Sequence, residues 1–401
     1  MIQENSRTRA HIDWFLIILV YGLSIFGIVA VSVATFSTTS EVDVPFWNHV
    51  VESSYAIRQS LFVFIISPIV LVLLMNAPYV WLNRYAPLLY YLSVFLLTVV
   101  WVFNRAEGVK AWLDVLWGFT IQPSEFAKLS MILILARVLS TKDIPMSNLP
   151  DTIRVFAILG LPAFVIIASG EMGSLIVIGV IAAMMMLFSG APWQVLVGLA
   201  AAAVIGAAAI FGFLMATGSD SYRLIRILAF LNPEQYSASG AYQQTQSKIA
   251  IGSGGLNGIG TFVPGAMSQL NYVPADWTDF IFATIGEAWG FRGCMLLIFA
   301  YLVLILYMMY LAYNTRDKFG QLIIIGVTGM MLFHVVENIG MAIGILPITG
   351  IPLPFISYGG SNMVTCMGGI ALVLNVTKNR SLTSQISTPQ RQAIIQQLTR
   401  A

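Results

Sequence analysis

A series of long apolar segments constrains this chain more than any other feature of its sequence. A helix rises about 1.5 Å per residue, so roughly 20 apolar residues are needed to cross a hydrocarbon core about 30 Å thick. Apolar runs bounded by charged residues, Pro and Gly predict about ten such helices, and hence an all-α, polytopic integral membrane protein. The predicted helices cover residues 14–35, 57–75, 85–103, 125–139, 154–168, 172–188, 193–215, 280–313, 321–345 and 360–376.

The composition agrees with a chain that lies mostly in lipid. Of its 401 residues, 58% are hydrophobic and 9% are charged, whereas a soluble domain has about 25% charged residues. The formal net charge is only +2, without a basic cluster of the kind that follows a phosphate backbone, so we expect no nucleic-acid partner. Cys294 and Cys366 lie in apolar runs and have no disulfide or metal-site spacing.

Two of the predicted spans have an alternative interpretation. Arg7 and Arg9 precede the first apolar run, which exceeds the roughly 7 to 15 residues of a signal-peptide core, so we expect a retained first span. The fifth and sixth helices are separated only by residues 169–171, and a re-entrant arrangement would have a similar sequence.

The distribution of Lys and Arg favours a cytoplasmic N-terminus. Short cytoplasmic loops are enriched in these residues, and this orientation leaves the larger share of the 20 on the inner side. Residues 1–13 are then a cytoplasmic N-terminus, residues 14–377 a ten-helix membrane domain, and residues 378–401 a polar cytoplasmic tail. The longest loop, about residues 216–278 between the seventh and eighth helices, faces outward. We therefore expect any chemistry on the extracytoplasmic side.

Asp279 stands where a polar loop meets the long apolar helix predicted from residue 280. Either Thr278 or Asp279 is suited to cap that helix, because a side-chain oxygen there accepts backbone N–H bonds and complements the helix dipole. A carboxylate at the water boundary is equally suited to act as a general base or to hold a hard cation. The local sequence leaves both possibilities open.

Ionisable residues inside the predicted spans need partners or a wet cavity, because an acid at a span centre costs about 2.5–3.5 kcal/mol. We expect Glu287 to line a functional cavity, with structural bridging as the alternative. His334, Glu337 and Asn338 share one helix face at spacings of three and four. Two ligands are too few for a zinc site, so this face indicates an interhelical hydrogen-bond cluster.

Basic residues of the outer loops are candidate phosphate contacts. Lys248 precedes the glycine-rich residues 252–260, which lack the Gly-Lys-Ser/Thr of an ATP-binding loop, so we expect no nucleotide. Those glycines form either an anion-binding nest or plain turns. Arg223 and Arg226, three residues apart, are either phosphate clamps or interfacial anchors. Lys128 lies one turn inside the fourth helix, beyond what capping by Pro123 and Glu125 explains.

Four segments, residues 122–128, 250–255, 278–283 and 350–361, resemble the SEDS family (shape, elongation, division and sporulation) in sequence and order, its RodA-like branch most of all. The resemblance implies a bacterial cytoplasmic-membrane enzyme with both termini inside. Such an enzyme polymerises lipid II into peptidoglycan strands outside and releases undecaprenyl pyrophosphate. It works with a class B penicillin-binding protein, a transpeptidase.

The resemblance also implies roles for individual residues. Asp279 matches the essential acid of the family and is predicted to be the catalytic base, or a ligand of a divalent cation such as Mg²⁺ or Mn²⁺. A single base suffices because pyrophosphate leaves without protonation, unlike the alkoxide that glycosidases release with a second carboxylate. The remaining candidates are substrate-binding Lys128, Arg223, Arg226, Lys248, Trp112, Glu125, Ser357 and Ser361, and supporting Glu287, His334 and Glu337.

The chain departs from the family pattern at several positions. Trp277 replaces a common His, Ala288 a second acid, Ile259 a Lys and Ala111 an Arg, while residues 169–171 replace Gln-Pro-Asp. Two other functions stay open from the sequence. One is a flippase for lipid-linked precursors, and the other is a non-catalytic scaffold for a class B penicillin-binding protein.

Overall fold

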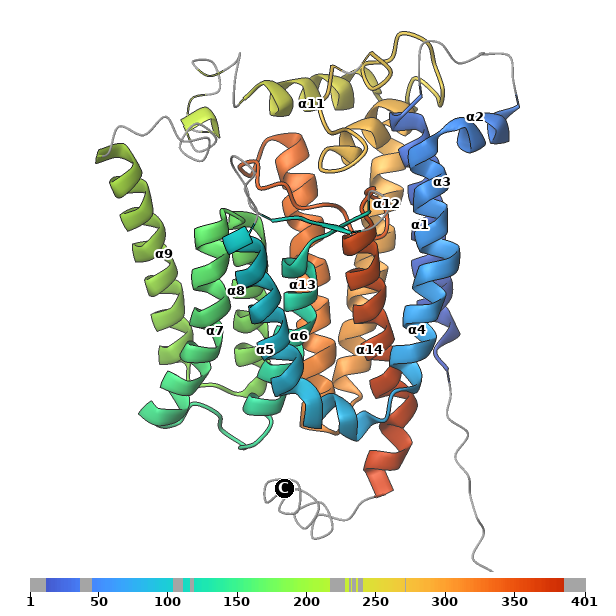
Figure 1. Cartoon of the computed structure of the whole chain (residues 1–401). Coiled ribbons are helices and arrows are strands. Elements are labelled where there is room, and N and C mark those ends of the chain that lie inside the picture. The colour runs from blue at the N-terminus through green and yellow to red at the C-terminus, as the bar shows by residue number, and fades with distance from the viewer. Residues whose placement is uncertain are drawn as a thin grey trace, which may run out of the picture.

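The protein is a bundle of long helices that run roughly parallel or antiparallel to one another (Figure 1). The chain is described here from a computed structural model. The residues that the structure describes are 12–36, 45–103, 111–115, 119–216, 228–230, 232, 236, 241–270 and 272–385.

Helices dominate the described residues, and the strands form only one short antiparallel hairpin. The strands are β1 (Leu113–Val115) and β2 (Phe119–Ile121). The helices are α1 (Trp14–Ala34), α2 (Phe46–Glu52), α3 (Ser54–Leu61), the π-helical turn η1 (Phe62–Ile66), α4 (Ser67–Asn76), α5 (Tyr79–Phe103), α6 (Pro123–Leu139), α7 (Leu149–Ser169), α8 (Met172–Ser189), α9 (Trp193–Ala216), α11 (Tyr242–Ser253), α12 (Ile281–Tyr313), α13 (Lys318–Ile343) and α14 (Gly360–Gln385).

The predicted spans coincide with these helices. Within the described residues, 8 helices are long and apolar enough to cross a membrane, one of them the continuous run Ser54–Asn76. The shorter α6, of 17 residues, and α9 occupy the other two predicted ranges. Gly170, with φ of 92°, ends α7 before α8 begins, so the fifth and sixth predicted helices are two separate spans.

Helices α13 and α14 are the most buried of the spans. Helix α13 packs against α6, α8, α12 and α14, and α14 packs against α4. At one end of the bundle, Nδ2 of Asn375 in α14 donates to the carbonyl oxygens of Leu74 (2.8 Å) and Ala77 (2.7 Å) at the end of α4. At the opposite end, α2 and α11 lie across the helix ends (Figure 1). Helix α12 begins at this second end.

The glycine-rich residues 252–260 pack against a break in α12. Gly290 has φ of 63° and ψ of −163°, values that interrupt the helix there. The backbone N–H of Ile259 donates to Glu287 O (2.9 Å), and that of Gly260 donates to Ala288 O (3.1 Å). These two N–H groups therefore satisfy helix carbonyls and do not form the anion nest considered above.

Glycine is required in this segment because the two backbones touch. A Cβ atom on Gly254 would lie 1.9 Å from the carbonyl oxygen of Gly286, and one on Gly258 would lie 2.1 Å from that of Ala288. Real Cβ atoms do not approach oxygen so closely, so any larger residue would push the segment away from α12. The outer loop is thereby fastened to the helix that follows Asp279.

Candidate active site

Asp279 lies in the turn that leads into α12 and is half-buried. A Cβ atom on Gly350 would lie only 3.3 Å from Oδ2 of Asp279, so the carboxylate faces the loop after α13. Phe280 occupies the N-cap position of α12, which has no side-chain cap hydrogen bond, and Oγ1 of Thr278 donates to Ala275 O. The N-cap position therefore falls on Phe280, and the capping alternative considered for Thr278 and Asp279 is not supported.

Residues 349–358, here called the site loop, connect α13 to α14 and run beside this turn without regular helix. Oγ of Ser357 donates to Thr278 O (2.6 Å), and the N–H of Tyr358 donates to Trp277 O (3.0 Å). Oγ1 of Thr349 donates to Oε1 of Glu337 in α13 (2.7 Å). The turn of Asp279 and the site loop thus form one hydrogen-bonded unit.

A buried polar cluster lies between α6 and α13. Nζ of Lys128 donates to Oε1 of Glu125 (2.7 Å) and to Nε2 of His334 (3.2 Å). Lys128 is 2% exposed and Glu125 3%, so this ion pair is inside the bundle. Of the face predicted to form an interhelical hydrogen-bond cluster, His334 does bond to another helix. Glu337 and Asn338 bond instead to Thr349, Asp279 and Ile351, which lie in non-helical segments, so the prediction holds for His334 alone. A phosphate could reach Lys128 only by entering the bundle.

Glu171, at the start of α8, belongs to the same region and was not among the predicted site residues. Its Oε2 accepts hydrogen bonds from Oγ of Ser124 (2.5 Å), Nε2 of Gln122 (2.8 Å) and Oγ of Ser174 (3.1 Å). It holds the first turn of α6 against α8. The available signal was an acid at a break between two apolar helices, a position that usually has a specific partner.

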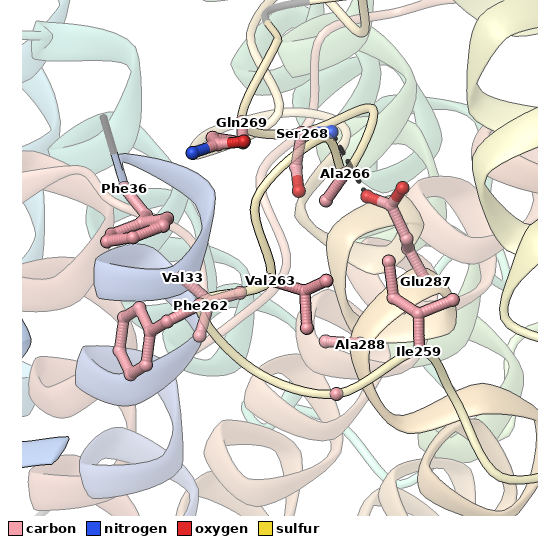
Figure 2. Close-up of a pocket in the computed structure, with 11 residues that line it drawn as sticks. Val33, Phe36, Ile259, Phe262, Val263, Ala266, Ser268, Gln269, Glu287 and Ala288 are labelled. Atoms are coloured by element: carbon pink, nitrogen blue, oxygen red, sulfur yellow. Dashed lines mark hydrogen bonds between the residues drawn. The ribbon is translucent and has the colours of Figure 1, made fainter. Parts of the chain in front are cut away.

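Glu287 forms part of the wall of a small pocket between the end of α1, the glycine-rich segment and α12 (Figure 2). Phe36 and Phe262 lie across the pocket from it. Its Oε1 accepts from the N–H of Met267 (2.6 Å) and its Oε2 from that of Ser268 (3.0 Å). The carboxylate therefore organises the loop that leads to Asp279. This arrangement favours the structural-bridging interpretation of Glu287.

Asp276 is a second acid in the turn of Asp279, and its side chain is fully buried. Burial, together with the negative charge of Glu287, raises the pKa of the Asp276 carboxyl to about 8, against a smaller opposing effect of the backbone N–H groups of Asp276 and Trp277. Asp276 is therefore largely protonated at neutral pH. It was not predicted as a site residue, because nothing in the local sequence distinguishes a buried loop acid from an exposed one.

The other predicted site residues lie at different depths. Lys248 is exposed on α11, and its side chain covers Gly344 at the end of α13. Trp112 is largely exposed just before β1. Oγ of Ser361 donates to Thr120 O (3.3 Å) and accepts from the N–H of Gln122 (3.2 Å), so it fastens α14 to the hairpin and α6. The predicted contacts Arg223 and Arg226 lie outside the described residues.

The protein side chains around Asp279 do not form a ready-made metal cage. Among the residues that the structure describes, no group of three or more His, Cys, Asp or Glu is arranged to hold a metal ion. Magnesium, however, is commonly bound by one or two carboxylates together with substrate phosphates. Asp279, half-buried at the end of the bundle, fits that shared mode of binding.

Comparison with known proteins gives consistent results. The sequence model of the FtsW, RodA and SpoVE family, described as "Cell cycle protein", matches residues 13–382. The peptidoglycan glycosyltransferase MrdB of Escherichia coli K12 is 34% identical over 302 residues, covering 75% of this chain and 80% of that protein. Stage V sporulation protein E of Bacillus subtilis is 34% identical over 331 residues, covering 81% and 87% respectively.

The fold is also similar to that of a solved structure. A chain of a peptidoglycan synthase complex, described as coordinating polymerization and crosslinking, superposes with a TM-score of 0.74 and 27% sequence identity. The match covers 92% of this chain and 98% of that chain. The similarity therefore extends over most of the chain.

Proposed function

This chain belongs to the FtsW, RodA and SpoVE family and is a peptidoglycan glycosyltransferase, and from this we propose that it polymerises lipid II into glycan strands with release of undecaprenyl pyrophosphate. It is a multi-pass membrane protein. The observation that carries the proposal within the site is the half-buried Asp279, whose carboxylate faces the site loop at one end of the bundle. A flippase or a purely structural scaffold does not require such an acid.

Asp279 acts as the general base in the proposed reaction. It accepts the proton of the acceptor sugar hydroxyl while that oxygen attacks the anomeric carbon of the donor. A new glycosidic C–O bond forms, and the bond from the anomeric carbon to the pyrophosphate oxygen breaks with its electron pair. Positioned bases contribute about 10²–10⁴-fold to such steps. Pyrophosphate leaves as a stabilised anion, so no second carboxylate is needed as an acid.

Lys248 is the foremost of the four proposed phosphate contacts. It is exposed on α11 and covers the end of α13, from which the site loop departs. Lys128 is buried inside the bundle, where it pairs with Glu125. We therefore propose that it contacts a phosphate deeper in the bundle than Lys248 does. Arg223 and Arg226, basic residues of the same outer loop as Lys248, are the other two proposed phosphate contacts. Trp112, Glu125, Ser357 and Ser361 remain predicted substrate contacts.

A divalent cation, Mg²⁺ or Mn²⁺, is proposed to bind Asp279 together with oxygens of the lipid pyrophosphate. Such an ion supplies positive charge that neutralises the departing pyrophosphate. We further propose that the end of the bundle with α2 and α11 faces outward and that both termini are cytoplasmic. A class B penicillin-binding protein is the proposed partner, since the similar solved chain belongs to a complex that coordinates polymerization and crosslinking.

The decisive experiment is polymerisation of purified lipid II by the chain in complex with its transpeptidase. We expect Asp279→Asn to lower the rate by at least about 10²-fold, because the amide cannot accept the proton at neutral pH. Asp151→Asn, on a half-buried residue of α7 that pairs with Lys142, is the matched control and keeps wild-type activity. Chelation is expected to abolish activity, and added Mg²⁺ or Mn²⁺ to restore it.

Each part of the proposal fails on a different result. A wild-type complex that makes no glycan from lipid II contradicts the function. Asp279→Asn with wild-type activity contradicts the base assignment alone. Activity that survives exhaustive chelation contradicts the proposed role of the cation and leaves the other parts of the proposal intact.

A further inference from the structure

Asn338 in α13 joins the two segments that meet at Asp279. Its side chain is fully buried. Nδ2 donates to the carbonyl oxygen of Asp279 (2.7 Å) and to that of Ile351 in the site loop (2.8 Å). A side-chain amide has only two N–H hydrogens, so both are used here.

The two carbonyl groups belong to segments far apart in the sequence. Asp279 precedes α12, whereas Ile351 follows α13 and is the neighbour of Gly350, against which the Asp279 carboxylate lies. One amide therefore sets the spacing between the acid and the loop it faces. Glu337 is the preceding residue of α13, and its Oε1 accepts a hydrogen bond from Oγ1 of Thr349 in the same loop (2.7 Å). This bond also fixes the site loop to α13.

The element that carries Asn338 is suited to such a role. Helix α13 is among the most buried spans and packs against four other spans, so its residues provide a fixed reference for two irregular segments. Oδ1 of Asn338 has no hydrogen-bond partner among the described residues. An unpaired buried acceptor is unfavourable, and the hydrogen bonds of this side chain among the described residues are the two that it donates.

We propose that Asn338 is the positioning residue of this enzyme, which holds the backbone of Asp279 and thereby aims its carboxylate at the acceptor hydroxyl. Asn338 itself touches no substrate atom in this proposal and acts through Asp279. The inference rests on the proposed role of Asp279 as base. It adds that the geometry of this base is set from α13 and not by the turn alone.

The test compares Asn338→Ala with a matched variant, Asn375→Ala. Asn375 is also a fully buried amide whose Nδ2 donates to backbone carbonyls, but it does so at the other end of the bundle. We expect both variants to lose similar thermal stability. Only Asn338→Ala is expected to lower kcat, by on the order of 10²-fold, because small displacements of a reacting group have effects of that size. The KM for lipid II is expected to stay within about two-fold.

A fall in kcat no larger than that of Asn375→Ala, or a loss confined to KM, would overturn the inference. If Asn338→Ala does not purify as a monodisperse protein, Asn338→Asp and Asn375→Asp give the same comparison with nearly unchanged side-chain volume. Asp279→Asn is assayed in parallel. If it is inactive while Asn338→Ala keeps its kcat, only the positioning role fails; if it is fully active, the proposed base fails.

Discussion

At the scale of single residues, the turn before α12 contains two acids three positions apart in different environments. Asp276 is fully buried and its pKa is raised to about 8, whereas Asp279 is half-buried and faces the site loop. Enzymes commonly separate the roles of two carboxyl groups by giving them different surroundings. Here Asp276 is a buried element of the turn, and Asp279 is the acid that we propose for the chemistry.

The raised pKa of Asp276 predicts a specific dependence of stability on pH. The folded state keeps the Asp276 proton up to about pH 8, while the unfolded chain releases it near the usual value of 3.8. The folded state therefore binds more protons within this window, and wild-type stability falls as pH rises from about 4 to 8. Asp276→Asn removes this loss, so its Tm is expected to exceed that of wild type at pH 8.

Thermal unfolding in one detergent at pH 5, 6.5 and 8 measures the effect. The difference in Tm between Asp276→Asn and wild type is expected to shrink towards pH 5. Asp151→Asn serves as the control, with the same chemical change at a partly exposed residue. A difference in Tm that is independent of pH would contradict the buried, protonated state of Asp276.

How far these residues were predictable depends on how local their signal is. Asp279 stands at a loop-to-helix boundary within a recognisable segment, so the sequence alone identifies it. Nδ2 of Asn338 donates to carbonyl groups of residues that are 59 and 13 positions away in the sequence. Oε2 of Glu171 accepts from Oγ of Ser124, which is 47 positions away. Such partners depend on how the helices pack, which a single sequence does not specify.

At the scale of elements, the glycine-rich segment after α11 shows how a local pattern can be misread. Glycines in a row permit an anion nest, a turn or a close backbone approach, and the sequence does not distinguish them. The break of α12 at Gly290 decides the matter, because it exposes helix carbonyls that the segment's N–H groups satisfy. The function of these glycines is contact with a helix about 30 residues further along the chain.

This packing predicts opposite effects for two neighbouring glycines. Gly254→Ala places a Cβ atom 1.9 Å from Gly286 O, and overpacking of this kind costs about 1–3 kcal/mol. Gly252, inside α11, has no atom within 4 Å of such a Cβ, so Gly252→Ala gains about 0.5–1 kcal/mol of helix stability. Denaturation midpoints in detergent should therefore move in opposite directions. Equal shifts would show that the segment does not rest on α12.

At the scale of the whole molecule, the positions of the spans along the chain were predictable because lipid offers the backbone no hydrogen-bond partners. Every span must then be a long apolar helix, and hydropathy is sufficient to find it. The short elements outside the spans were not predicted: α2, α11 and the β1–β2 hairpin are too short or too polar to give a periodic signal. Of these, α11 packs against α12 and α13, and β2 packs against α14.

The proposed orientation can be tested with single cysteines at opposite ends of the bundle. Leu256, after α11, is 65% exposed, and Ile144, between α6 and α7, is 59% exposed, whereas the native Cys294 and Cys366 are buried and give little background. A membrane-impermeant maleimide is expected to label Leu256→Cys in intact spheroplasts. Ile144→Cys should react only after permeabilisation. The reverse pattern would contradict an outward-facing site.

The packing of α14 against α4 also determines when this protein becomes complete. The carbonyl groups at the end of α4 accept hydrogen bonds from Asn375, which follows them in the chain by about 300 residues. Ser357 and Ser361, at the entrance to α14, similarly join the turn of Asp279 and the start of α6. A ribosome makes Asn375 about 300 residues after the end of α4. During synthesis the second span is thus inserted long before α14, its neighbour in the folded bundle, exists.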